Sequence, residues 1–217
     1  MKYNEFNEFE FGAHAIALKL VPKVSRVLEL GCASGFFSQR LKENGCSVVG
    51  IDFDAEALKK AKPFCDKTIA ADLDVVSSLP LEKNSFDFAL AMDVLEHQRN
   101  PSNTLSLALP LLKKGGTLVV STPNIANWKI RLKLLFGKFS YTKKGIMDEG
   151  HAHFFTRDSL KQLLEASGFS VKEWAYSSGF PFPNPFKWRA IESFKHLIST
   201  ILPGIFSFQL IAVAEKR

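Results

Sequence analysis

Residues 26–37 read Arg-Val-Leu-Glu-Leu-Gly-Cys-Ala-Ser-Gly-Phe-Phe. The apolar run that ends at Gly31 predicts a buried strand, and a glycine-rich turn follows it at once. Gly31 and Gly35 let the backbone turn sharply and lie against a ligand without a Cβ in the way. A helix predicted over 36–44 points its free N–H groups back at that ligand. The stretch therefore predicts a strand, a ligand-binding turn and a helix.

A second apolar run, Ser-Val-Val-Gly-Ile-Asp at 47–52, ends in a carboxylate about 20 residues after the glycine turn, where βαβ units hold a ribose diol. Gly31 and Asp52 thus indicate a nucleoside site at the carboxyl ends of the strands. Asp54 is the predicted N-cap of the next helix, which runs to Lys62. Further strands are predicted at 68–71, 86–92 and 117–121, and a helix at 101–112. Strands that alternate with helices predict a parallel sheet covered on both faces.

The later part of the chain departs from this alternation. Residues 123–155 contain Pro, Trp, several Lys and two His, and they are too long for a plain connection, which predicts a functional segment. A helix over 156–166 and strands at 169–176 and 208–214 are predicted around an amphipathic helix. The apolar side of that helix consists of Trp188, Ile191, Phe194, Ile198 and Ile201. At the start, 1–11 predicts a frayed end or lid, and a short helix follows over 13–19.

Length and composition suit one globular domain over 1–217, since 46% of the 217 residues are hydrophobic. No apolar run is long enough for a membrane span, and the N-terminus lacks the basic-then-apolar order of a signal peptide. Cys32, Cys46 and Cys65 form no C-x-x-C pair, so they are interpreted as reduced thiols or core residues. These features together predict a cytoplasmic protein.

The net charge of +6 comes from one segment. Its six basic residues are interrupted by no acid and are Lys129, Arg131, Lys133, Lys138, Lys143 and Lys144. As a helix, 128–139 places bulky residues on one side, namely Trp128, Leu132, Leu135, Phe136 and Phe139. The favoured interpretation is that this side packs while the lysines face water. The alternative is peripheral contact of 128–139 with an anionic membrane or a phosphate-bearing substrate.

Over nearly its whole length the chain resembles the class I S-adenosylmethionine-dependent methyltransferases. The motifs that carry the resemblance lie at 29–35, 50–52, 71–72, 86–87, 92–97 and 112–116. The run Gly-His-Ala-His-Phe-Phe-Thr at 150–156 is similar to small-molecule members, including quinone O-methyltransferases and enzymes of surface-polysaccharide gene clusters. The resemblance implies an α/β, Rossmann-like, mostly parallel sheet of order 3-2-1-4-5-7-6 with strand 7 antiparallel. It also implies helices on both faces and a helical cap, for which 123–155 and 180–205 are the expected substrate-side insertions, while 1–22 is expected to form an N-terminal lid or helix.

The family's cofactor is S-adenosylmethionine, which leaves as S-adenosylhomocysteine. By resemblance, Glu29 binds the cofactor's amino group directly or through water, Asp52 accepts both ribose hydroxyls, and Asp72 accepts from the adenine amino group. Ala33 replaces the middle glycine of the family's G-x-G-x-G and is small enough to keep the turn. In full, the implied cofactor-binding residues are Glu29, Gly31, Cys32, Ala33, Gly35, Asp52, Phe53, Asp72, Leu73 and Met92.

Methyl transfer from a sulfonium is an in-line displacement, so the protein mainly aligns the acceptor and, where needed, removes its proton. His151 is the first candidate base, with His97 and His153 after it, and each has the alternative of a structural histidine bonded to a carbonyl. Asp93, Glu96 and His97 share one face if they form a helical turn. Similar quinone O-methyltransferases use such a set for a divalent ion, but capping and a surface ion pair are favoured here, so no metal is predicted.

The predicted function is transfer of a methyl group to a small-molecule or lipid- or sugar-linked acceptor, at a hydroxyl. One alternative is a quinone or phenol O-methyltransferase, and an alternative of another class is a catalytically silent S-adenosylmethionine-binding module. A nicotinamide enzyme is disfavoured because it does not need Asp72. A nucleic-acid substrate is not predicted, because no Asn/Asp-Pro-Pro-Tyr signature follows the strand at 86–92. The acceptor atom and the oligomeric state stay open.

Overall fold

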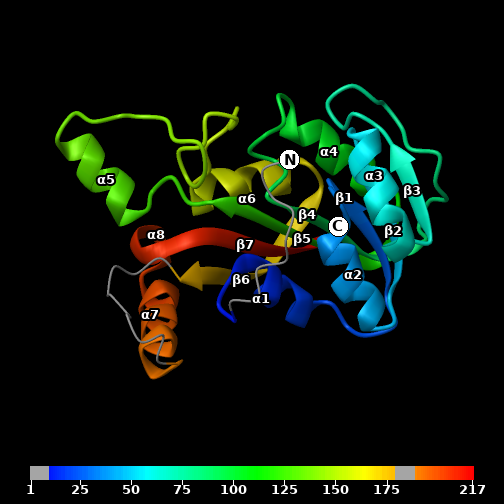
Figure 1. Cartoon of the computed structure of the whole chain (residues 1–217), viewed down its shortest axis with the longest axis horizontal. Helices are drawn as coiled ribbons and strands as arrows, with labels where there is room; N and C mark the ends of the chain where they lie inside the picture. The colour runs from blue at the N-terminus through cyan, green and yellow to red at the C-terminus, as the bar shows by residue number, and fades with distance from the viewer. Residues whose placement is uncertain (1–9, 179–188) are drawn as a thin grey trace.

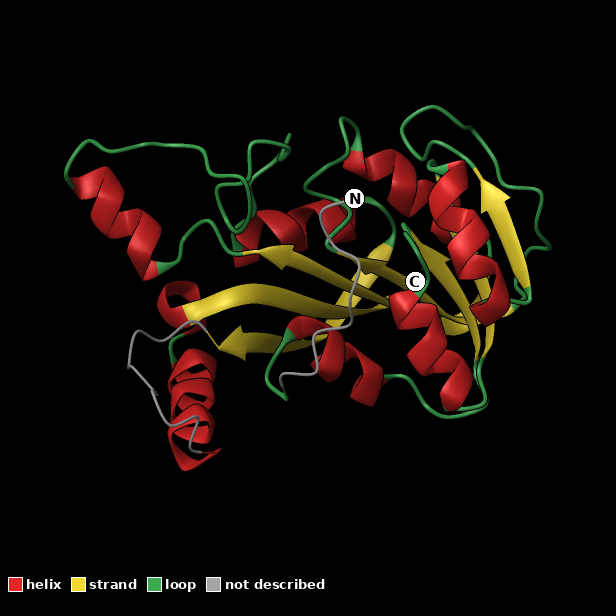
Figure 2. Cartoon of the chain, viewed as in Figure 1, coloured by secondary structure: helices red, strands yellow, loops and turns green. Residues whose placement is uncertain are grey.

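A seven-stranded sheet forms the centre of the computed structural model, which describes residues 10–178 and 189–217 (Figure 2). The strands are β1 (Arg26–Leu30), β2 (Ser47–Asp52), β3 (Lys67–Ala70), β4 (Phe86–Met92), β5 (Leu112–Pro123), β6 (Phe169–Ser178) and β7 (Ser207–Lys216). Their order is β3-β2-β1-β4-β5-β7-β6, with β7 antiparallel to both neighbours and the other pairs parallel. The predicted fold class is confirmed.

Helices pack on both faces of this sheet (Figure 1). The helices of the described residues are α1 (Ala13–Leu20), α2 (Phe36–Glu43), α3 (Ala55–Ala61), the 3-10 turn η1 (Lys62–Phe64), α4 (Pro101–Ala108), α5 (Trp128–Leu135), α6 (Arg157–Ala166), α7 (Arg189–Ile201) and α8 (Pro203–Phe206). One buried cluster joins α1, α2 and α3 to the sheet, and the other joins α4 and α6 to it. Neighbouring strand residues such as Val27 and Leu28 enter opposite clusters, as the period of two requires.

Two predicted boundaries are wrong around β5. The helix predicted over 101–112 ends at Ala108, and the strand predicted over 117–121 begins at Leu112. Leu112 pairs with Phe86 ahead of a register shift, so strand pairing extends β5 through the polar Lys-Lys-Gly-Gly turn. Gly116 permits this because a Cβ there would lie 2.9 Å from the carbonyl oxygen of Lys113. Pairing with β4, which sequence periodicity does not report, decides this boundary.

The favoured packing of 128–139 is also wrong. Within α5 only Ile130 is buried, in a small cluster with Ile146 and Met147. Leu135 and Phe136, which the sequence places on the packed side, are 77% and 69% exposed. Figure 1 shows the reason: α5 stands at one end of the molecule, away from the helices that cover the sheet.

Other sequence-based expectations have mixed outcomes. In α7, Ile191 and Ile198 are half-buried while Phe194 and Ile201 are exposed, and Trp188 lies outside the described residues, as do 1–9. The cysteines are free and buried, as expected. In the described part of the chain, no helix is long and apolar enough to cross a membrane.

Candidate functional site

One cavity of about 1030 Å³ opens where β1, β2, β4 and β5 end. It joins residues of the predicted cofactor site to the histidines proposed for the acceptor. The predicted cofactor residues that line it are Gly31, Ala33, Asp52, Phe53, Asp72, Leu73 and Met92. Glu29, Cys32 and Gly35 are not among the lining residues. Most of the predicted cofactor residues therefore line this cavity, and the other three do not reach its surface.

The glycine turn keeps the chain tight between β1 and α2. Gly31 has φ +72°, and a Cβ there would come within 2.5 Å of a Val94 methyl group. Gly35 has φ +80° and begins α2, with no side chain capping the helix. Ala33 has φ +47°, so the alanine keeps the left-handed turn that its position requires, as predicted.

Asp52 is buried at the end of β2 with its carboxylate fixed by backbone groups. The Ala33 N–H donates to Oδ2 at 2.8 Å, and the Asp54 N–H donates to Oδ1 at 2.9 Å. Each oxygen keeps a further lone pair for a ligand. Phe53 and Asp72 lie beside it on the cavity wall, where Phe53 is 78% exposed. This arrangement suits a diol with a planar ring next to it.

Glu29 lies behind the turn. Its carboxylate is buried and accepts a hydrogen bond from Ser38 Oγ. Burial raises the pKa of Glu29 to about 8. Cys32 is buried beside it, packed where Gly50 leaves room for its Sγ. Both side chains are buried and neither lines the cavity. Direct contact of Glu29 with the cofactor's amino group therefore stays a prediction.

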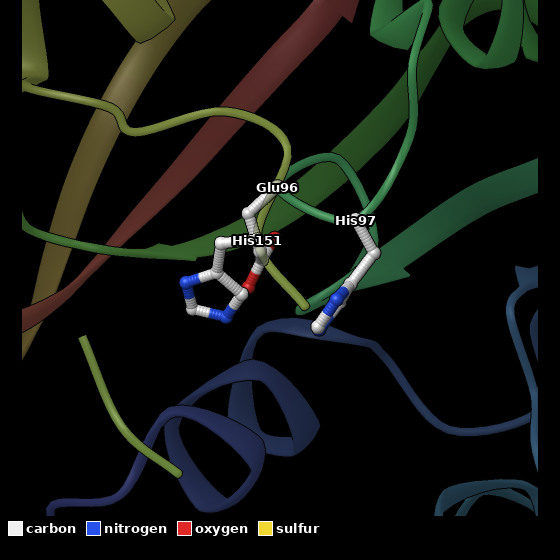
Figure 3. Close-up of side chains that lie close together, drawn as sticks. All are labelled: Glu96, His97 and His151. Carbon is white, nitrogen blue, oxygen red and sulfur yellow. The ribbon is translucent and has the colours of Figure 1, made fainter. Parts of the chain in front are cut away.

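Three potential metal ligands that line the same cavity lie close together (Figure 3). Glu96 and His97 come from the loop after β4, and His151 comes from the segment between α5 and α6. One ligand atom from each lies within 4.8 Å of those from the other two. The two imidazole rings are edge to face with centroids 4.8 Å apart.

A hydrogen bond to a backbone carbonyl engages one nitrogen of each imidazole ring. His97 Nδ1 is 3.0 Å from the Gly150 carbonyl oxygen, and His151 Nδ1 is 3.2 Å from that of Ile146. Since a carbonyl only accepts, each Nδ1 donates, and in the neutral ring each Nε2 then keeps its lone pair. Burial lowers the pKa of His151, and His97 lowers it further, which favours the neutral ring. Neutral imidazoles whose other nitrogen is bonded to a carbonyl are typical metal ligands.

Glu96 carries the unusual feature of this cluster. Its carboxylate is 1% exposed, and neither oxygen has a hydrogen-bond partner among the described residues. Burial, and next the charge of Asp93, raise the pKa of Glu96 well above its usual range. A buried carboxylate without partners is costly, and a divalent ion between it and two imidazoles removes that cost. The residues present therefore fit a divalent ion.

Asp93 does not belong to this cluster, contrary to the predicted helical face. Residues 93–97 form a turn, with Asp93 at φ +54°, and not a helix. The Asp93 carboxylate instead accepts from Ser121 Oγ at 2.7 Å and from Gln209 Nε2 at 2.7 Å. His151 takes the place that the sequence pattern gave to Asp93.

His153 lies apart from the cavity wall. Its Nε2 donates to the Arg99 carbonyl oxygen at 3.1 Å, and its ring stacks on Phe155. This is the structural alternative that the sequence left open for each histidine.

Sequence reasoning missed several cavity residues. His14 reaches the cavity from α1, Gln209 from β7, and Lys144 from the segment after α5. Burial lowers the pKa of His14, and the charge of Asp93 opposes that effect. A polar residue in an apolar stretch was the only available signal for His14. Nothing in the sequence connects Gln209 with Asp93, since 116 positions separate them.

The sequence profile of a family described as "Methyltransferase domain" matches residues 6–173. The chain belongs to this methyltransferase family. Its cofactor is S-adenosylmethionine, which agrees with the diol-binding carboxylate and the glycine turn on the cavity wall.

Curated relatives are similar over most of this methyltransferase. The chain is 32% identical over 174 residues to the mitochondrial ubiquinone biosynthesis O-methyltransferase of Rattus norvegicus, covering 75% of this chain and 49% of that protein. It is 28% identical over 177 residues to the ubiquinone biosynthesis O-methyltransferase of Coxiella burnetii, covering 79% and 74%. The chain thus spans about half the length of the rat protein.

Among solved structures, a Thermotoga maritima S-adenosylmethionine-dependent methyltransferase, described as a possible histamine N-methyltransferase, superposes with a TM-score of 0.65. It shares 21% identity and covers 96% of this chain and 90% of its own. At that identity the similarity supports the fold alone, and the methyl acceptor has to be inferred from the residues of the site.

Proposed function

We propose that this methyltransferase moves the methyl group of S-adenosylmethionine to a hydroxyl of a phenolic, quinone-type small molecule. The sequence predicts a hydroxyl of a small-molecule or lipid- or sugar-linked acceptor, with a quinone or phenol as the alternative. The proposed acceptor is that alternative. Two of the relatives are O-methyltransferases of ubiquinone biosynthesis, which supports a phenolic acceptor. The cluster of Glu96, His97 and His151 shares one cavity with the cofactor residues, which supports chemistry at a hydroxyl.

The observation that carries the proposal is the unpartnered, buried carboxylate of Glu96. We infer that Glu96 and the Nε2 atoms of His97 and His151 hold a divalent cation such as Zn²⁺. Such a cation, when bound, supplies Lewis acidity that lowers the pKa of a hydroxyl from the ~10 of a free phenol.

The chain's own residues set the conditions for this chemistry. The carbonyls of Gly150 and Ile146 hold the two imidazole rings through Nδ1, which leaves Nε2 as the available ligand atom of each neutral ring. Ser121 and Gln209 occupy the Asp93 carboxylate with hydrogen bonds, so Asp93 is not one of the ligands of the cluster. Asp52 and the glycine turn line the same cavity, where they would hold the cofactor. Alignment of the acceptor behind the methyl group supplies much of the rate.

The test is transfer of a labelled methyl group to 3,4-dihydroxybenzoate as a catechol probe. We expect transfer to one ring hydroxyl, its loss after dialysis against a chelator, and its return when Zn²⁺ or Mg²⁺ is added. Full activity after chelation would contradict the cation and favour His151 as the direct proton acceptor. Transfer only to sugar or lipid hydroxyls would contradict the phenolic acceptor. Tight S-adenosylhomocysteine binding without transfer to any acceptor would favour a silent binding module.

A further inference from the structure

Exposed apolar side chains gather at one end of the molecule. Of the fourteen large hydrophobic residues exposed in the described part of the chain, eleven lie within 132–141 and 194–208. These ranges cover the second half of α5 with the loop after it, most of α7, α8 and the start of β7. Figure 1 shows the three helices at the same end of the sheet. A concentration of this kind marks a surface that meets something other than water.

Hydrogen bonds make these segments one surface. Asn127, the N-cap of α5, donates from Nδ2 to the Ser207 carbonyl oxygen at 2.8 Å. Arg131 donates from Nη2 to the Gly204 carbonyl oxygen in α8 at 3.3 Å. The start of α5 is therefore fixed against α8, and both segments can meet the same partner.

The side chains of α5 are distributed as in a helix that lies on a membrane surface. Leu132, Leu135 and Phe136 form an outward stripe, and they are 48%, 77% and 69% exposed. Lys129 and Lys133 flank that stripe, while Ile130 faces the protein and is buried. Apolar residues between lysines let a helix enter the headgroup region while its charges stay among the lipid phosphates.

Charge decides between possible partners. From Lys129 to Lys144 the chain carries six basic residues and no acidic one. The ion pairs within the described residues include none of Lys129, Lys133 and Lys138. A second copy of this chain, docked face to face, would bring like charges together. An anionic lipid surface complements both the charge and the apolar stripe.

We propose that the docking face, formed by 128–144 with the exposed residues of 194–208, binds anionic lipid membranes. Lys144, at the end of this face, and the neighbouring Gly145 also line the cavity. Docking therefore brings the cavity close to the lipid surface. The proposal concerns the surface alone, so it does not depend on the identity of the methyl acceptor.

The test is co-sedimentation with vesicles of phosphatidylcholine, with or without about one-third phosphatidylglycerol. We expect the wild type to bind only the anionic vesicles, and less strongly as salt shortens the Debye length from ~10 Å at 0.1 M. Changing Lys129, Lys133 and Lys138 to Gln should lower the partition coefficient about 100-fold. The double change Leu135→Ser and Phe136→Ser should lower it about tenfold.

A matched control changes the same number of exposed lysines on another part of the surface. Lys60, Lys62 and Lys83 are exposed, and their change to Gln removes the same charge. This control should keep most of the vesicle binding, and S-adenosylhomocysteine calorimetry checks that every variant is folded. No binding by the wild type at low salt, or equal loss in both lysine triples, would overturn the proposal. A concentration-dependent dimer that the Leu135 and Phe136 changes abolish would assign the face to a second copy instead.

Discussion

At the cofactor end of the cavity, the lining residues of the glycine turn, β2 and β3 come from one stretch of the chain, from Gly31 to Leu73. The acceptor end is assembled from residues that lie far apart in the sequence. His97 meets the Gly150 carbonyl 53 positions away, and Asp93 meets Gln209 116 positions away. The first end is fixed by backbone turns and their N–H groups, and the second by side chains on separate loops. The fixed end suits a constant cofactor, while the assembled end can change its acceptor through loop substitutions.

The largest effect that separates the two ends is expected for Glu96→Gln. Loss of the carboxylate removes the charged ligand of the cluster, so kcat/KM should fall by about 10³. S-adenosylhomocysteine affinity, measured by calorimetry, should stay within about threefold, because Asp52 and the glycine turn are untouched. Glu82→Gln, on an exposed position, is the control. A parallel loss of cofactor affinity would mean that the two ends are not independent.

The reciprocal change, Asp52→Ala, should act on the cofactor end. It removes two charge-assisted hydrogen bonds, which contribute roughly 1.5–3 kcal/mol each before water compensates. We expect S-adenosylhomocysteine affinity to fall about 100-fold while Zn²⁺ binding is unchanged. Asp158→Ala on the exposed first turn of α6 serves as the control. Affinity equal to that of the wild type would contradict the role of Asp52.

A smaller effect is expected for the pH dependence of stability. The folded chain holds the Glu29 proton up to about pH 8, whereas the ordinary pKa of 4.5 governs the unfolded chain. The unfolded state therefore binds fewer protons between these values, and the free energy of unfolding falls as pH rises through this window. Between pH 6 and 8, Glu29→Gln should lose about 2 kcal/mol less stability than the wild type. Urea unfolding at both pH values measures this, and equal losses would show that Glu29 is ionised in the folded protein.

The smallest effect is expected at Ala33, which has φ +47°. Glycine adopts this conformation without a Cβ penalty, but it also gives the unfolded chain more freedom. Ala33→Gly should therefore raise the free energy of unfolding by about 0.5 kcal/mol and leave S-adenosylhomocysteine affinity unchanged. Thermal unfolding measures the difference. A clear loss of stability would show that the turn is not strained at this position.

Most of the predicted cofactor residues line the cavity, because the sequence signals at that end are largely local. Asp54 caps the helix that follows it, and its N–H donates to Asp52 two residues away, whereas the hydrogen bond from Ala33 to Asp52 spans 19 positions and depends on the pairing of β1 with β2. The strand order followed from a family resemblance. The limits of β5 did not follow, because pairing with β4 extends that strand beyond its apolar run.

The acceptor end was only partly predictable. His97 and His151 were named as candidates, but their meeting with Glu96 depends on how two loops cross. The left-handed backbone of Asp93 breaks the helical spacing that seemed to include it. For α5, the apolar stripe was visible in the sequence, and whether another element covers it was not.

The claim that this cavity joins a cofactor site to a cation site is tested most directly by Zn²⁺ titration of the metal-free protein. Calorimetry on the wild type, Glu96→Gln and His97→Ala, without cofactor or acceptor, separates binding from turnover. The account predicts one ion per chain for the wild type and at least about tenfold weaker binding for each variant. A wild type that binds no ion, or variants that bind as tightly as the wild type, would contradict it.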